Sequence, residues 1–449
     1  MTRTTLFGRV AAALLVSAIP CAGLHAQAAD PLASLSPDKR AFLSDAATLE
    51  KLGLTPEKVQ IALAGRTPQQ VDAYAAALMQ LLEDAKFKPG RDAGEIALNP
   101  QARGFNSGTI VRPKILDKVK RDDGPFSLKR YMYQKAGVPT FADAPVAIRL
   151  EDLTAGKVDV AFVGVPLDFS SGWRDAKHAP EALRGMDGLV GADADGGVDP
   201  GLVLNLADYG NLTIDPMAPD RGLDHVRSML ADVAKAGVVP FVVGGDHTLM
   251  YPDVAAMVDA YGAGNVAVVQ FDAHADAEEN GDHLISDNQT LTRLLAENIV
   301  RPANVTHVGL RGRGATGAVK ARLAAAGVKL VPMQAISEKG AVAATDAIVA
   351  GLRGGPANVF VSFDMSVLDP GDAPASGRPV PGGITMREAI PMVRRICSET
   401  KVVGFDLLDT APILDPTYLT RLSANYILHA CLSGIALRKA AATQTAAAR

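Results

Sequence analysis

Three short apolar runs in the sequence lead directly into acidic and imidazole side chains. Each run is rich in Val and Phe and becomes polar only at its C-terminal end, as expected of strands buried on both faces of a parallel sheet. Ligands bind at that edge of open α/β sheets, so side chains from all three runs should meet there. These side chains belong to His247, Asp272, His274, Asp276 and Asp364.

The acidic residues in this set predict a metal site. In extended backbone, Asp272, His274 and Asp276 would share one face, whereas a turn after Phe271 would fan them around an ion. Taken singly, each Asp could cap a helix, and each His could be a buried histidine with its hydrogen bonds made inside the core. Together, ionised carboxylates in a dry crevice would repel one another, and a divalent cation is the usual way to keep several of them ionised.

The same residues lie in an ordered series of short motifs. In chain order these are Gly244-Gly-Asp-His-Thr248, Asp272-Ala-His-Ala-Asp276, Ser362-Phe-Asp364, Leu368-Asp-Pro370 and Pro379-Val-Pro-Gly-Gly383. The series resembles the signatures of the ureohydrolases, the arginase and agmatinase family, over about residues 137–440, and an ordered set is more specific than any single motif. The resemblance implies an α/β/α sandwich, a binuclear manganese centre and hydrolysis of a guanidino group to urea and an amine.

The resemblance also implies how the ligands divide between two ions. The first ion would be held by His247, Asp272, Asp276 and Asp364, and the second would take His274 and share Asp272 and Asp364. Carboxylates with two imidazoles suit a hard to borderline ion, so manganese is the first expectation and nickel or zinc the alternatives. Such an ion lowers the pKa of bound water, in favourable cases to about 7.

Three positions depart from the family pattern. The family has Asp-x-Asp after Ser-Phe, but this chain has Asp364-Met-Ser366, so the second ion loses a carboxylate. Asp409 stands where a Glu usually cradles the guanidinium, and it is one methylene shorter. Ser286-Asp-Asn288 replaces a Ser-His-Gly, which leaves His283 as a proton shuttle or an exposed surface histidine. These departures predict an unusual substrate, a weakened second metal or lost activity.

The N-terminus predicts export. Arg3 and Arg9 flank an apolar run over residues 10–19, and Ala26-Gln-Ala28 offers small residues to a signal peptidase. Residues 1–28 therefore read as a secretory signal, too short for a membrane span, and the mature protein is expected to be periplasmic or secreted. Two cysteines, Cys397 and Cys431, remain after its removal, either as buried thiols or, in an oxidising compartment, as one disulfide.

The rest of the chain divides into a helical extension and an α/β domain. Residues 30–136 are expected to form helices and then a linker or arm, because Ser36-Pro37, Thr55-Pro56 and Thr67-Pro68 are helix-start signals. The extension could be a lid or surface decoration, but an oligomerisation element is favoured, and with it a homo-oligomer. A ureohydrolase-like domain is expected over 137–440 and a disordered tail over 441–449.

Strands alternate with helical stretches from Val158 onward, which predicts a parallel sheet with helices on both faces. A closed barrel would share this pattern, and it is the family resemblance that favours a three-layer α/β/α sandwich with an eight-stranded, mainly parallel sheet. The expected strands are near 158–164, 203–208, 238–243, 266–271, 304–310, 328–333, 358–363 and 402–408.

With 48% hydrophobic and 21% charged residues, the 449-residue chain can bury a substantial core. Its net charge of -4 gives no reason to expect nucleic acid or an anionic membrane surface as a partner. The sequence therefore predicts an exported, metal-dependent hydrolase of guanidino or amidine C–N bonds, with agmatine-like or small guanidino-acid substrates. The alternative is a non-catalytic or single-metal homologue that binds a guanidino compound or serves as a structural subunit.

Overall fold

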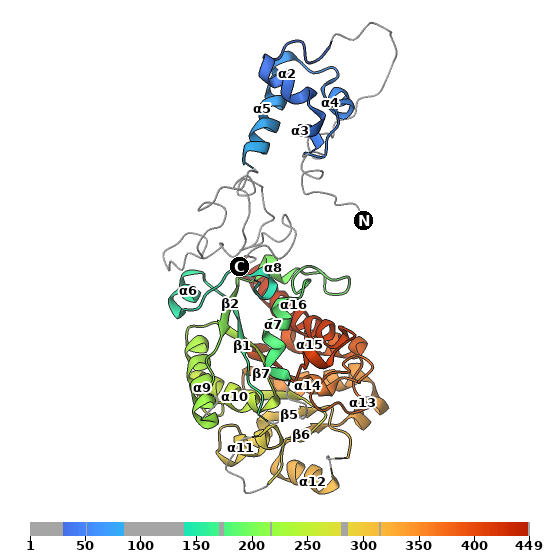
Figure 1. Ribbon diagram of the computed structural model, residues 1–449. Coiled ribbons are helices and arrows are strands. Elements are labelled where there is room, and N and C mark those ends of the chain that lie inside the picture. The colour runs from blue at the N-terminus through green and yellow to red at the C-terminus, as the bar shows by residue number, and fades with distance from the viewer. Residues whose placement is uncertain are drawn as a thin grey trace. The chain divides into compact units, whose positions relative to one another are not determined.

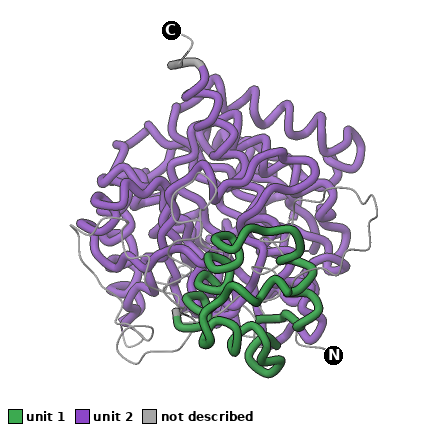
Figure 2. The backbone as a smooth tube through the Cα atoms, turned by 90° about the horizontal axis from the view of Figure 1, so that it is seen from above, with its two compact units in different colours: residues 1–94, 111–120, 130–136 green, residues 95–110, 121–129, 137–449 purple. Residues whose placement is uncertain are grey.

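The computed structural model describes residues 30–50, 52–84, 139–169, 175–215, 218–279, 286–313 and 316–447. These residues belong to two compact units, which are coloured separately in Figure 2. The expected signal at 1–28, the arm at 91–136 and His283 lie outside the described residues. Among the helices of the described part, none is long and apolar enough to cross a membrane.

The N-terminal unit consists of short helices around a leucine-rich core, as the helix-start signals predict. Its helices are α2 (Pro37–Ser44), α3 (Ala46–Glu50), α4 (Pro56–Leu63) and α5 (Pro68–Asp84). Thr55 caps α4 by accepting a hydrogen bond from the Lys58 N–H at 3.3 Å, and Thr67 and Gln70 cap α5 reciprocally. Leu49 and Leu78 are fully buried in the core of this unit.

The second unit is built on an open sheet of eight parallel strands, which confirms the predicted sheet. The strands are β1 (Val160–Val165), β2 (Leu206–Asn211), β3 (Val239–Gly244), β4 (Val266–Phe271), β5 (Val305–Val308), β6 (Lys329–Val331), β7 (Asn358–Asp364) and β8 (Lys401–Leu408). Their order across the sheet is β2-β1-β3-β8-β7-β4-β5-β6, and every pair is parallel. The central strands are buried on both faces because neighbouring residues, such as Phe241 and Val242, enter different cores.

Helices cover both faces of this sheet and make the three-layer sandwich (Figure 1). One core holds residues of α9 (Pro219–Lys235), α10 (Met250–Tyr261), α11 (Thr290–Ala296) and α12 (Gly317–Ala326). The other holds residues of α7 (Ala179–Arg184), α13 (Met333–Lys339), α14 (Ala341–Arg353), α15 (Met386–Glu399) and α16 (Leu419–Ala447). The short helices α6 (Leu150–Ala155) and α8 (Pro200–Val203) lie before β1 and β2.

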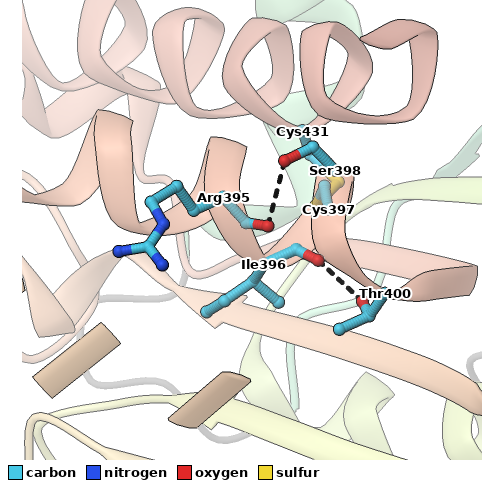
Figure 3. The surroundings of a disulfide bond; sticks show 6 residues. All are labelled: Arg395, Ile396, Cys397, Ser398, Thr400 and Cys431. Carbon is cyan, nitrogen blue, oxygen red and sulfur yellow. Dashed lines mark hydrogen bonds between the residues drawn. A yellow bond between two sulfur atoms is a disulfide. The ribbon is translucent and has the colours of Figure 1, made fainter. Parts of the chain in front are cut away.

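The C-terminal helices decide two of the expectations, one about the C-terminal tail and one about the two cysteines. The disordered tail expected from residue 441 is wrong as far as Ala447, because α16 continues through this alanine-rich stretch, and Ala has the strongest helix propensity. Cys397 of α15 and Cys431 of α16 form a disulfide, which settles the choice left open between thiols and a bridge. Figure 3 shows this bond beside the last turn of α15, where the Thr400 hydroxyl donates to the Ile396 carbonyl at 2.7 Å.

Candidate metal centre

The candidate ligands converge at the carboxyl ends of strands β3, β7 and β4, and β8 lies between β3 and β7 in the sheet. His247 follows β3 in a short 3-10 turn, Asp272 follows β4, and Asp364 ends β7. All three are buried, and one ligand atom from each lies within 4.8 Å of the others. The structure therefore brings residues from three separate sequence segments into one group that can hold a metal ion.

Tight backbone turns place His247 in this group. A Cβ at residue 245 would overlap the Leu167 carbonyl, so only glycine lets the chain leave β3 this close to the loop after β1. Asp246 then ties the turn together: its Oδ1 accepts from the Thr248 N–H at 3.0 Å and its Oδ2 from the Phe169 N–H at 2.5 Å. As a result the His247 Nδ1 atom lies 3.1 Å from Asp272 Oδ2 and 3.7 Å from Asp364 Oδ2.

Asp276 joins the group through a turn, the second of the two arrangements that the sequence left open. Strand β4 ends at Phe271, and Asp276 has a φ of 47°, which bends the chain back toward His247. Asp276 Oδ2 is hydrogen-bonded to His247 Nδ1. Its other oxygen, Oδ1, is buried without a hydrogen-bond partner among the described residues, so the carboxylate retains a free coordinating atom.

His274, Asp272 and Ser366 form a second group next to the first. His274 Nδ1 lies 3.2 Å from Asp272 Oδ1, and the Ser366 hydroxyl lies 3.1 Å from that same oxygen and 3.4 Å from His274 Nδ1. Ser366 thus faces the position of the expected second ion, with a hydroxyl in place of a carboxylate. Asp369 is not a substitute ligand, because its carboxylate accepts the backbone N–H groups of Gly371, Gly382 and Gly383.

The electrostatics of the cluster fit a cation. Burial raises the pKa of Asp276 well above its usual range, and the charge of Asp272 adds to this. Burial would lower the pKa of His247, but Asp276 and Asp272 outweigh it and hold that pKa well above the usual value. The cluster therefore retains protons that compensate its carboxylates. A divalent ion would replace those protons, so the donor set and its orphaned Asp276 oxygen suit a metal.

Asp409 follows β8 and has one unused carboxylate oxygen. Its Oδ2 accepts the Gly377 N–H at 2.9 Å, whereas its Oδ1 is buried and has no hydrogen-bond partner in the described part of the chain. Burial, together with the charges of Asp364 and Asp287, raises the pKa of Asp409 well above its usual range. An incoming cation would relieve this cost, so Asp409 is suited to bind a guanidinium group.

The loop that departs from the family pattern binds an arginine that the sequence reasoning missed. Arg378 Nη2 donates to Asp287 Oδ2 at 2.6 Å, and its Nη1 donates to Asn288 Oδ1. Arg378 also lines a small pocket beside His274 and Asp276. Its position directly before the Pro379-Val-Pro-Gly-Gly383 motif was the only signal in the sequence that it belongs to the site.

The chain is similar to several known proteins in sequence and in fold. The proclavaminate amidinohydrolase of Streptomyces clavuligerus is 29% identical over 295 residues, 64% of this chain and 92% of that protein. Its solved structure matches with a TM-score of 0.60 at 28% identity, covering 68% of this chain and 98% of the other. An agmatinase of Chromobacterium violaceum is 30% identical over 280 residues, 60% of this chain and 81% of the relative. Trypanosoma cruzi formiminoglutamase, solved with Mn2+, shares the fold at a TM-score of 0.58 and 23% identity, over 65% of this chain and 99% of the other.

The sequence profile of the arginase family matches residues 158–433, a range that contains every described residue of the candidate metal centre. The named relatives that align over most of their own length are amidinohydrolases and agmatinases. The chain therefore belongs to the arginase family and is a hydrolase of carbon–nitrogen bonds other than peptide bonds.

Proposed function

We propose that the protein is an exported, metal-dependent hydrolase of small guanidino compounds, either agmatine-like or guanidino acids, that releases urea. The observation that carries the proposal is the buried group of His247, Asp272 and Asp364, whose ligand atoms lie within 4.8 Å of one another at the carboxyl ends of β3, β4 and β7. Similarity to an agmatinase and to a human guanidino acid hydrolase supports this substrate class.

Manganese is the proposed ion, held by His247, Asp272, Asp276 and Asp364, with nickel or zinc as alternatives. Binding of Mn2+ by the formiminoglutamase neighbour supports this choice. When bound, a divalent ion lowers the pKa of water and so supplies a nucleophile at neutral pH. A second ion would be held by His274 and by the shared carboxylates of Asp272 and Asp364, and it would bind more weakly because Ser366 offers a neutral hydroxyl.

Side chains of this protein orient the substrate and handle its protons. The free Oδ1 of Asp409 accepts an N–H of the guanidinium and pairs with its charge, which holds the planar group against the metal centre. His283 remains the proposed proton shuttle, although it lies outside the described residues. The leaving amine requires a proton, which an imidazole near its ordinary pKa can donate.

Export is supported by two independent features. The first 28 residues carry the charge, apolar run and small residues of a secretory signal. The Cys397–Cys431 disulfide is the second, because disulfides persist in oxidising compartments and are rare in the cytosol. We also propose a homo-oligomer, with the N-terminal extension as its assembly element.

A substrate panel tests the proposed activity. The metal-depleted full-length protein is reloaded with Mn2+ and incubated with agmatine, 3-guanidinopropionate, 4-guanidinobutyrate and arginine, and urea is measured. Mn2+-dependent urea release from at least one compound is the expected result. Saturable binding of a guanidino compound without release of urea would instead favour the non-catalytic alternative. The absence of both binding and turnover would refute the substrate class.

A further inference from the structure

An arginine that is not a candidate ligand lies in the pocket beside the metal centre. Arg378 lines this pocket together with the candidate ligands His274 and Asp276. The residue before it, Gly377, donates its N–H to Asp409 Oδ2 at 2.9 Å. Arg378 is therefore placed next to the metal centre and one residue away from a contact with the carboxylate that is proposed to bind the guanidinium of the substrate.

Two side chains orient the guanidinium of Arg378. Its Nη2 donates to Asp287 Oδ2 at 2.6 Å, and its Nη1 donates to Asn288 Oδ1. Arginine has five N–H donors, so these two bonds leave others for a ligand. One of them is Nε–H, whose nitrogen is buried and has no hydrogen-bond partner in the described part of the chain. The side chain is 30% exposed, so a small molecule can reach this oriented group.

Two side chains of the pocket could recognise the far end of a substrate. Arg378 offers only donors, so it favours a carboxylate, which its planar group can bind through two parallel hydrogen bonds. Glu278 also lines the pocket and would favour an ammonium group, as in agmatine. Glu278 is exposed, however, and water screens an ion pair at such a site and leaves it little net energy. Arg378 is half-buried and already oriented, so its bonds to a carboxylate are the stronger of the two.

The other arginine of the pocket, Arg311, is committed to the backbone. Its Nη2 donates to the carbonyls of Ser366 and Leu368 at 2.8 and 3.1 Å, and its Nη1 donates to the Val367 carbonyl at 3.1 Å. Arg311 therefore holds the loop that carries Ser366, and it adds positive charge to the pocket. Among the described lining residues, Arg378 is the better placed of the two arginines to bind a ligand.

We propose that Arg378 is a specificity-determining residue that binds the carboxylate of a guanidino acid, so that the protein hydrolyses guanidino acids in preference to agmatine. This inference rests on the hydrolysis of guanidino compounds proposed above. With the guanidino group at the metal centre and Asp409, a carboxylate at the other end of a short chain reaches Arg378. Agmatine ends in an ammonium group, which has donors and a positive charge but no acceptor for Arg378.

A matched pair of substrates isolates the carboxylate. 4-Guanidinobutyrate and its amide, 4-guanidinobutanamide, have the same chain length and differ only in the charge at the far end, and agmatine is the cationic third member. Urea release from each is measured at steady state with full-length protein loaded with Mn2+. Arg378→Met removes the guanidinium and keeps an unbranched side chain. Arg353→Met is the matched control, because Arg353 is an exposed arginine of α14 that pairs with Glu399.

We expect wild type to have a higher kcat/KM for the acid than for the amide, and Arg378→Met to lower this ratio by about 10- to 100-fold, the usual effect of losing hydrogen bonds to a charged group. The change should lie mainly in KM for the acid, because the carboxylate is bound equally before and during the reaction. Turnover of agmatine should not fall, and Arg353→Met should keep the wild-type ratio. An unchanged ratio in Arg378→Met, or a wild-type preference for agmatine over the acid, would overturn the inference.

A second variant separates substrate binding from anchoring of the loop, because Arg378→Met also removes the partner of Asp287. Asp287→Asn breaks the ion pair but keeps the guanidinium of Arg378, so the preference for the acid over the amide should remain. A loss of preference as large as in Arg378→Met would show that the ion pair sets the specificity, and the inference would fall.

Arg378→Lys keeps the test open if Arg378→Met does not fold. It retains the charge without the planar group, so it should also lower the ratio of acid to amide, and a wild-type ratio would contradict the proposal. If wild type releases urea from none of the three compounds, the proposed function fails. If wild type releases urea and the ratio is the same in every variant, only the role of Arg378 fails.

Discussion

At the scale of single residues, we propose that Ser366 weakens the binding of a second metal ion. Its hydroxyl lies 3.1 Å from Asp272 Oδ1 and 3.4 Å from His274 Nδ1, where a carboxylate would add both charge and a coordinating oxygen. We predict that Ser366→Asp raises occupancy of the second site, seen as an additional equivalent when metal-depleted protein is titrated with Mn2+ in a calorimeter. Ser366→Ala is the control and should bind as wild type does. Tight binding of two ions by wild type, or unchanged stoichiometry in the Asp variant, would contradict this account of Ser366.

We propose that Asp409 binds the substrate cation at a cost to the stability of the fold. Its buried Oδ1 has no partner in the described residues, and its pKa is raised well above the usual range by burial and by nearby carboxylates. We predict that Asp409→Asn lowers kcat/KM by about 100-fold, because the substrate cation loses its charge partner. The melting temperature should stay equal to or rise above that of wild type, because the amide replaces a buried carboxyl group that is costly to ionise. Steady-state kinetics with metal analysis and thermal unfolding check both parts; wild-type kcat/KM would exclude Asp409 from substrate binding.

Most residues of the candidate site could be predicted from the sequence, but several of their contacts with other side chains could not. The candidate ligands could be recognised because each ends or follows a buried strand. By contrast, Arg378 and Asp287 are 91 residues apart in the sequence, and they form an ion pair only once the fold is complete. Such contacts depend on tertiary approach, which neither periodicity nor spacing reports.

At the scale of elements, buried strands were predicted well and their ends less well. Strand β4 coincides with its predicted bounds of 266–271, because a continuous apolar run stops at Asp272. Strand β2 begins at Leu206 instead of 203, because Asp199 caps a helical turn that starts at Pro200 and includes Val203. Strand β5 ends at Val308, because Gly309 has a φ of 100° that breaks the extended backbone. Turn chemistry, more than hydrophobicity, decided these boundaries.

The disulfide between α15 and α16 stabilises the helical layer on one face of the sheet. It closes a loop with a sequence separation of 34 residues, and constraining the unfolded chain in this way contributes about 2–4 kcal/mol. We predict that replacing Cys397 and Cys431 with Ala lowers the free energy of unfolding in urea by that amount. Reductant should destabilise wild type and leave the double variant unaffected. Equal unfolding midpoints for oxidised wild type and the variant would show that the bond contributes nothing.

At the scale of the whole molecule, we propose that export places the reaction outside the cytosol. The signal features of residues 1–28 and a disulfide between the cysteines that remain after cleavage fit the same compartment. We predict that N-terminal sequencing of the protein purified from its native host begins close to Ala29. Alkylation of the native protein should label no thiol before reduction, and it should label Cys397 and Cys431 after reduction. An intact Met1 terminus in a cytosolic fraction would refute export.

The account as a whole depends on a metal ion bound between strands β3, β4 and β7, with Asp272 shared by both ligand groups. The most direct test is Mn2+ content per chain, measured by elemental analysis on full-length wild type and Asp272→Ala after loading and desalting, with urea release recorded on the same samples. Asp259→Ala removes a carboxylate that pairs with Arg227 and is the matched control. We predict at least one Mn2+ per chain and urea release in wild type and the control, and loss of both in Asp272→Ala that added Mn2+ does not restore. Full metal content and full activity in Asp272→Ala would contradict the assignment of this centre.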